Sequence, residues 1–191
     1  MLFKYWVVCF LLFILFIQAR ASSFMPAVTN YLAKDYEAGY QNWACAQGSN
    51  GEMYFGNSQG LLVYDGYRWT LHKVPGNHIV RSVYVKEDRI YVGAFEEFGY
   101  FKYSEAGTLR YHSLSKFLKN FPMENNEIWN IVELDGRIYF QSFSAWFSYD
   151  GKMVHAFRNR QQQPLYFYTQ NGHIYTQMID EDFYEFDGKD F

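Results

Sequence analysis

The chain has 191 residues, of which 49% are apolar, 22% aromatic and 19% charged, and its formal net charge is −3. So much apolar surface excludes an intrinsically disordered chain. The abundance of Tyr and Phe, in place of Ala, Glu, Lys and Leu, disfavours a coiled coil. The slightly negative charge gives no sign of nucleic-acid binding in this segment.

The N-terminal residues have the pattern of an export signal. Lys4 is followed by an apolar run of 13 residues from Tyr5 to Ile17, and then by the small residues Ala19 and Ala21 around Arg20. This pattern predicts a secretory signal peptide over residues 1–21. The alternative is a membrane anchor, but a spanning helix needs roughly 20 apolar residues.

One apolar triplet with a central tyrosine recurs along the rest of the chain. The central tyrosines are spaced by 37, 48 and 36 residues, and three of the triplets follow an Asn-Gly or Asp-Gly pair that favours a tight turn. A second aromatic strand ends about ten residues after each of them. The four triplets are Met53-Tyr54-Phe55, Ile90-Tyr91-Val92, Ile138-Tyr139-Phe140 and Ile174-Tyr175-Thr176.

Each repeat is expected to form four short antiparallel strands. In the second repeat these strands cover Val80 to Lys86, Arg89 to Ala94, Phe98 to Tyr103 and Leu109 to Ser113. The middle strands are apolar at consecutive positions, which is typical of a sheet covered on both faces. Four-stranded units with a period near 40 predict an all-β fold, the β-propeller. A β-sandwich is the alternative, but it does not explain the recurring triplet.

The propeller is predicted over residues 27–191, with blades that start near residues 41, 80, 127 and 165. The longer second interval is explained by an insertion, in which residues 113–121 are predicted to form a short helix with a serine cap.

The four repeats do not add up to a complete ring of four-stranded blades. The fourth repeat reaches Asp187-Gly188 where its outer strand should begin, and Ala27 to Tyr31 resembles a lone strand before the first blade. We therefore expect an incomplete part of a larger propeller. A closed ring of four blades is the alternative, in which Thr29 to Tyr31 would supply the outer strand of the fourth blade.

Two segments, Asn50 to Gly56 and Gly60 to Trp69, give the best copy of a longer pattern. It reads Asp-Gly-(Ile/Met)-Tyr-(Phe/Val)-Gly and then Gly-Leu-x-x-Tyr-Asp-Gly, and Asn50 stands in the place of its first Asp. This pattern resembles the two-component-regulator propeller repeat. Residues 40–43, 97–101 and 139–143 resemble a bacterial subgroup of that family.

The resemblance, over roughly residues 27–191, implies an exported sensor with a small-molecule or glycan ligand. In that family the propeller precedes a triple-tyrosine immunoglobulin-like domain, one membrane-spanning helix, and a cytoplasmic histidine kinase or LuxR-type helix-turn-helix. It implies a location on the periplasmic side of the inner membrane, contact with the membrane only through a helix beyond this segment, and a homodimer as one option for the full-length protein. The sequence has no kinase, spanning-helix or DNA-reading motif, so the output is implied by the resemblance alone.

The expected ligand site lies at the end of the central channel, where the first strand of each blade begins. Counting back 10 or 11 residues from each central tyrosine gives Trp43, Arg81, Trp129 and Leu165. Two tryptophans and an arginine on one ring could stack on a sugar or peptide and donate hydrogen bonds to it. The alternative is that the tryptophans only fill space between blades.

Catalysis has weaker support in the sequence. Glu96 and Glu97, like the cluster Asp180 to Asp182, precede the third strand of a blade, where paired carboxylates could act on a glycosidic bond. No residue is assigned as catalytic, and Glu96 and Glu97 are instead added to Trp43, Arg81 and Trp129 as candidates for ligand binding. A solvated loop explains such pairs more simply. No histidine pair has metal-ligand spacing, and no cofactor is expected. Cys45 is expected to be a buried structural thiol in the strand 43–46.

Three functions remain open at this point. The first is a non-enzymatic, ligand-sensing module of a transmembrane regulator. The second is an exported propeller enzyme, a polysaccharide lyase or hydrolase, which would need a convergent catalytic set on one face. The third is an extracytoplasmic interaction scaffold.

Overall fold

The computed structural model describes residues 4–6, 10, 26–123, 125–158, 163–187 and 191, in two units, Met1–Tyr31 and Leu32–Phe191. In the first unit, the predicted signal peptide lies mainly outside the described residues. The strand expected from Ala27 to Tyr31 is wrong, because these exposed residues have no strand structure. A single extended segment gains little stability when no neighbouring strand satisfies its backbone groups.

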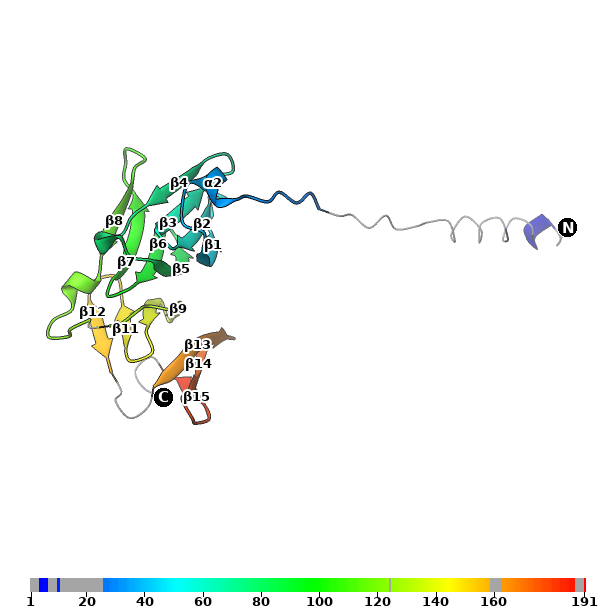
Figure 1. Cartoon of the computed structure of the whole chain (residues 1–191). Coiled ribbons are helices and arrows are strands. Elements are labelled where there is room, and N and C mark those ends of the chain that lie inside the picture. Colours follow the sequence, from blue (N-terminus) through cyan, green and yellow to red (C-terminus); the bar gives the residue numbers. More distant parts are fainter. Residues whose placement is uncertain (1–3, 7–9, 11–25, 124, 159–162, 188–190) are drawn as a thin grey trace. The chain divides into compact units, whose positions relative to one another are not determined.

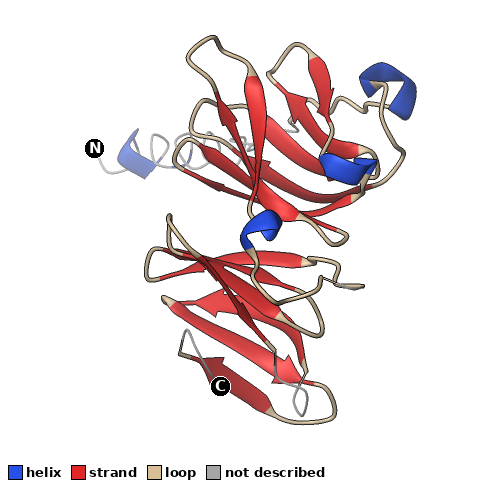
Figure 2. Cartoon of the chain, turned by 90° about the vertical axis from the view of Figure 1, so that its left-hand side faces the viewer, coloured by secondary structure: helices blue, strands red, loops and turns tan. Residues whose placement is uncertain are grey.

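The second unit consists of four antiparallel sheets in chain order (Figures 1 and 2). The first contains β1 (Asn42–Gln47), β2 (Met53–Asn57), β3 (Gly60–Tyr64) and β4 (Trp69–His72). The second contains β5 (Val80–Lys86), β6 (Arg89–Ala94), β7 (Phe98–Tyr103) and β8 (Leu109–Ser113). The third contains β9 (Asn130–Leu134), β10 (Arg137–Gln141), β11 (Trp146–Tyr149) and β12 (Val154–Phe157), and the fourth β13 (Pro164–Gln170), β14 (His173–Met178) and β15 (Phe183–Phe186). Short helices are α2 (Ala33–Tyr36), η1 (Pro75–Asn77) and η2 (Ser115–Phe117).

This arrangement confirms the predicted propeller fold, and the four strands of the second blade have the predicted bounds. The inner strands begin at Asn42, Val80, Asn130 and Pro164, compared with expected starts near 41, 80, 127 and 165. The fourth sheet has three strands among the described residues, and the sheets are not closed into a ring.

In the first and third blades an Asp-Gly pair forms the turn between the two outer strands. In the first blade, the Asp65 carboxylate accepts hydrogen bonds from the backbone N–H groups of Tyr67 and Arg68 at 2.8 and 2.6 Å. Gly66 has a φ of 96°, a conformation that costs a side-chain-bearing residue energy. The third blade repeats this geometry at Asp150 and Gly151, so the repeated sequence pattern encodes a repeated turn.

The core consists of three apolar clusters, each of which joins two successive blades. Between the second and third blades, Phe98 packs against Phe140 and Phe147 with ring centroids 4.6 and 4.9 Å apart. At the same junction Gly93 leaves room for its neighbours, because a Cβ there would lie 2.4 Å from both Ile128 and Ser82. Aromatic rings therefore fill the space between blades, which accounts for much of the aromatic excess of the chain.

The insertion contains much less helix than expected. Residues 113–121 were predicted to be helical with a serine cap, but only η2, a single 3-10 turn over Ser115–Phe117, forms, and no side chain caps it. The hydroxyls of Ser113 and Ser115 instead donate to Glu97 at 2.9 and 2.8 Å. The serines thus bind the segment before β7 in the second blade. Their hydroxyls are therefore not used to cap a helix in the insertion.

Cys45 lies in a strand, as predicted, but the prediction that it is buried is wrong, because its side chain is exposed. The strand β1 belongs to the first of the sheets, and every second residue of it, including Trp43 and Gln47, is exposed. Cys45 lies on this exposed face, whereas the partly buried Ala44 and Ala46 alternate with it.

His72 contacts Phe101 of the second blade with ring centroids 6.1 Å apart, and we expect it to make this junction sensitive to pH. Burial lowers the pKa of His72, although the Glu52 carboxylate acts in the opposite direction. Because the unfolded chain then binds a proton more readily than the folded one, we expect the free energy of unfolding to fall as the pH drops below about 6.5. Urea unfolding at pH 7.5 and 5.5 should show a smaller loss for His72→Gln than for the parent. The exposed His155→Gln variant should behave like the parent, and an equal loss in all three proteins would contradict this assignment.

Candidate functional site

Trp43, Arg81 and Trp129 come together, although they belong to three successive blades. The guanidinium carbon of Arg81 lies 3.8 Å from the ring centroid of Trp43 and 4.8 Å from that of Trp129. The two indole rings are 6.3 Å apart in an edge-to-face arrangement. We call these three side chains the central stack.

Irregularities at the beginning of two inner strands redirect the side chains of Trp43 and Arg81. The pairing of β1 with β2 shifts between Asn42 and Ala44, so Trp43 is an extra residue without a direct partner. The pairing of β5 with β6 shifts in the same way around Arg81. Such bulges bend a strand and redirect a side chain, and they are common next to binding sites.

Glu127 neutralises the charge at the centre of the stack. Its Oε1 accepts a hydrogen bond from Arg81 Nε at 2.5 Å, and the two side chains are 20% and 13% exposed. A second nitrogen, Arg81 Nη1, is buried without a hydrogen-bond partner in the described part of the chain. Cation–π attraction to the faces of Trp43 and Trp129 offsets part of the free-energy cost of burying this nitrogen without a hydrogen bond.

The insertion holds Glu127 in place. Its last residues attach to the end of β6, since the N–H of Ile128 donates to the carbonyl of Ala94 at 3.0 Å and Phe95 forms a bridge with Glu127. The sequence prediction did not include Glu127. The two residues of the pair are 46 positions apart, and no local pattern connects them.

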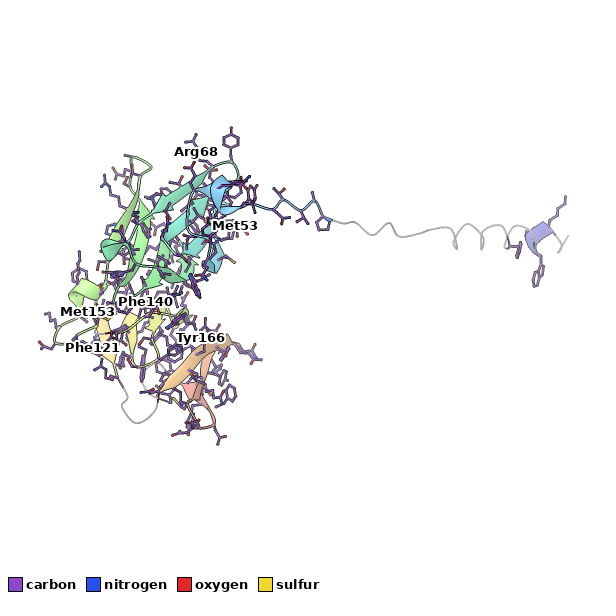
Figure 3. The ribbon with its side chains drawn as sticks, viewed as in Figure 1. Met53, Arg68, Phe121, Phe140, Met153 and Tyr166 are labelled. Atoms are coloured by element: carbon purple, nitrogen blue, oxygen red, sulfur yellow. The ribbon has the colours of Figure 1, made fainter. Side chains whose placement is uncertain are left out.

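A cavity of about 220 Å³ adjoins the stack. Trp43, Arg81 and Trp129 line it together with Asn130 and Tyr166. Tyr166, which is 40% exposed and labelled in Figure 3, lies in the irregular start of β13. We predicted Leu165 for this position, and the one-residue difference arises because the pairing of β13 with β14 shifts between Pro164 and Phe167.

The contacts within the central stack limit how much of each tryptophan ring is accessible to a ligand. Trp129 contacts the Arg81 guanidinium and also stacks on Phe143, with ring centroids 5.7 Å apart. Trp43 remains 41% exposed. A ligand in the cavity would therefore meet the accessible part of Trp43, the Tyr166 ring and the polar Asn130, while Trp129 supports the arginine.

The blades are also tied at the other end of these inner strands. Lys86 Nζ and the Tyr84 hydroxyl donate to Glu133 at 2.6 and 3.0 Å. The hydrogen bond from Lys86, against a smaller effect of burial, keeps the pKa of Glu133 below its usual value. The second and third blades are thus linked by ionic contacts at both ends, with the central stack at one end.

Glu96 and Glu97 do not line this cavity. The Glu96 carboxylate accepts a hydrogen bond from the N–H of Asn125 at 2.8 Å, which attaches it to the insertion. Glu97 Oε1 accepts from the hydroxyls of Tyr111, Ser113 and Ser115 at 2.8–2.9 Å. Burial, followed by the charge of Glu97, raises the pKa of Tyr111. In this structure both carboxylates bind other parts of the chain.

The role of Glu97 can be tested through stability. We expect Glu97→Ala to lower the free energy of unfolding by about 2 kcal/mol, because three hydroxyls lose their shared acceptor and that of Tyr111 is buried. The measurement is urea unfolding followed by tryptophan fluorescence. The control Glu105→Ala, at an exposed turn, should change the value by less than about 0.5 kcal/mol. Equal stability of the two variants would show that the hydroxyl cluster contributes nothing.

The described residues contain no group of three His, Cys, Asp or Glu side chains able to hold a metal ion. Within the same residues, no helix has the length and apolar character required to cross a membrane.

Comparison with known proteins gives matches at the level of structure. No family model matches the sequence, and no curated protein matches it either. The fold is similar to that of the extracellular domain of the hybrid two-component system BT4673 from B. thetaiotaomicron, with a TM-score of 0.57 and 16% identity over 78% of this chain and 21% of that one. The extracellular domain of the hybrid two-component system BT3049 from the same organism is similar too. Its TM-score is 0.57 and its sequence identity 16%, over 81% of this chain and 22% of that one.

A third similar structure is YCF48 from Cyanidioschyzon merolae, with a TM-score of 0.54 and 12% identity over 77% of this chain and 51% of that one. This chain spans about a fifth of the length of the two extracellular domains. The resemblance stated from the sequence is thus matched by the structural neighbours. The chain has the propeller-type fold found in the extracellular domains of hybrid two-component systems.

Proposed function

We propose that this chain is a ligand-sensing propeller module on the exported, periplasmic side of a transmembrane regulator. The observation that carries the proposal is the fold shared with extracellular domains of two such systems. The sequence pattern of the repeat supports it independently. In this proposal the segment itself is not catalytic, and the signalling output belongs to other parts of the regulator.

The ligand site of the proposed sensor is the cavity beside the central stack. Side chains from all four blades meet there, since Trp43, Arg81, Trp129 and Tyr166 each come from a different one. A glycan or other small molecule that contacts several blades binds best at one relative orientation of them. Binding would thereby favour one packing of the blades, which is what a sensor must transmit.

A titration tests the ligand site directly. Neutral, uronic-acid and sulfated oligosaccharides are added to the purified chain, and binding is followed by the fluorescence of its tryptophans. We expect one of these classes to bind and Tyr166→Ala to weaken that binding about tenfold. Tyr67→Ala, at a side chain that is 89% exposed in the first-blade turn, is the control and should bind like the parent. Equal binding by Tyr166→Ala would contradict the site, and failure of every class would contradict glycan sensing.

A further inference from the structure

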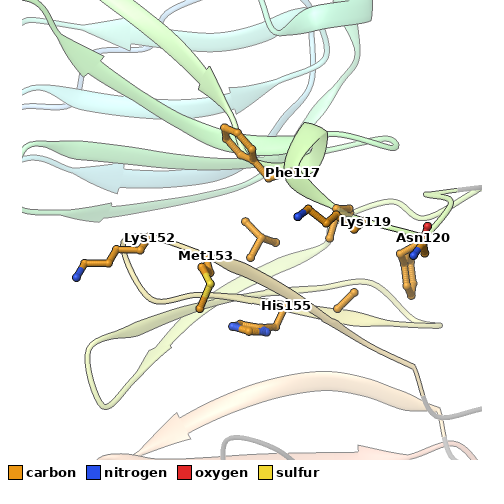
Figure 4. A pocket seen from close by; sticks show the side chains of 10 residues that line it. Phe117, Lys119, Asn120, Lys152, Met153 and His155 are labelled. Carbon is orange, nitrogen blue, oxygen red and sulfur yellow. The ribbon is translucent and has the colours of Figure 1, made fainter.

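A groove of about 580 Å³, which shares no lining residue with the cavity at the central stack, lies between the insertion and the outer strand of the third blade (Figure 4). Residues 117–121 form one wall and residues 152–156 the other. In Figure 4 the segment that carries Met153 and His155 runs beside the segment that carries Lys119 and Asn120.

One wall of the groove is an unpaired edge of a sheet. The strand β12 is the last in the order of its sheet and pairs only with β11, from Val154 opposite Tyr149 to Phe157 opposite Trp146. Among the described residues, no backbone group bonds to its other edge. Such an edge presents N–H and C=O groups that can pair with another extended segment.

Both walls carry apolar side chains, and the wall of residues 117–121 is held in place. Phe121 packs edge-to-face on Phe147 at 5.2 Å between centroids, and the Arg158 guanidinium covers it at 4.5 Å. Phe117 and Met153 are each 58% exposed at the groove, although both are large apolar side chains. A bound segment could therefore bury apolar side chains against a wall that does not have to be ordered first.

The charge at the groove is opposite to that of the chain. Lys119 and Lys152 line it, Arg158 and Lys116 lie beside it, and no carboxylate is among its lining residues. The whole chain, in contrast, has a net charge of −3. A local excess of positive charge favours an acidic partner and raises its rate of association.

We propose that this groove binds an extended, acidic segment of a partner protein, which adds a strand to the edge of β12. The main chain would pair with the edge, alternate apolar side chains would contact Phe117 and Met153, and acidic side chains would face Lys119 and Lys152. Two copies of this chain pairing through the same edge would bring their lysines together, so the positive charge disfavours self-association here. This proposal does not depend on the sensor role.

A synthetic peptide tests the proposal with the complete chain. The probe is fluorescein-labelled Asp-Val-Glu-Phe-Asp-Val-Glu, and binding is measured by fluorescence anisotropy. We expect it to bind at least about tenfold more tightly than Lys-Val-Lys-Phe-Lys-Val-Lys. The double variant K119E/K152E should weaken binding of the acidic peptide about tenfold. The control K34E/K73E changes the net charge equally at two exposed lysines of other regions and should leave binding within about twofold.

Backbone methylation separates strand addition from simple attraction of charges. One version of the acidic peptide is N-methylated at its apolar residues and another at its acidic residues. Because alternate N–H groups of a strand point to opposite edges, we expect one version to lose binding and the other to keep it. The proposal is overturned if the acidic peptide does not bind, if the lysine peptide binds equally, if K119E/K152E has no effect, or if both methylated versions bind like the parent peptide.

Discussion

Replacing Phe98 by alanine should lower the free energy of unfolding by about 3–5 kcal/mol, the largest effect expected for a single side chain here. Phe98 is fully buried at the start of β7, and its ring packs on both Phe140 and Phe147 of the next blade. The substitution leaves a cavity between two blades, and the rigid sheets on either side cannot close it. Urea unfolding measured by circular dichroism gives the change.

The matched control for this substitution is Phe183→Ala. Phe183 begins β15 and is 68% exposed, so the same chemical change removes little buried surface. We expect a change of less than about 0.5 kcal/mol there. If Phe98→Ala were no more destabilising than Phe183→Ala, the second and third blades would not be stabilised by the aromatic contacts between them.

The sequence predicts the blades well because two local signals coincide in each of them. In the second blade, apolar runs end at the positions where turn residues begin, so the bounds of all four strands agree with the structure. Where one local signal acts alone, the prediction is wrong. The serines of the insertion have the pattern of a helix cap, but their hydroxyls bind Glu97. Residues 27–31 have the sequence character of a strand but form none.

The candidate site could be located from the sequence, but its contacts could not be predicted. Repeat spacing identifies Trp43, Arg81 and Trp129 because each occupies the same position in its blade. Spacing does not show that the arginine lies against both indole rings. That contact depends on two strand irregularities and on Glu127, which the insertion supplies from a distant part of the chain.

Replacing Arg81 by alanine should lower the free energy of unfolding by about 2 kcal/mol. The change removes two cation–π contacts and leaves the Glu127 carboxylate, which is 20% exposed, without its cation. We expect the tryptophan emission to shift to longer wavelength as water reaches Trp43. Arg81→Lys should recover only part of the loss, because an ammonium group keeps the charge but lacks the flat surface that stacks on indole.

A comparison of two ion pairs tests whether burial or charge alone accounts for the stability that Arg81 contributes. Lys102 Nζ and Asp88 Oδ2 are also 2.5 Å apart, but the two side chains are 43% and 59% exposed. A double-mutant cycle with Arg81→Met and Glu127→Gln should give a coupling energy of about 1–2 kcal/mol, whereas Lys102→Met and Asp88→Asn should give less than about 0.5 kcal/mol. Equal coupling in the two cycles would mean that the tryptophans and the burial of Arg81 add nothing. The ion pair with Glu127 would then contribute no more than an exposed one, although the Arg81 side chain is 13% exposed and lies against two indole rings.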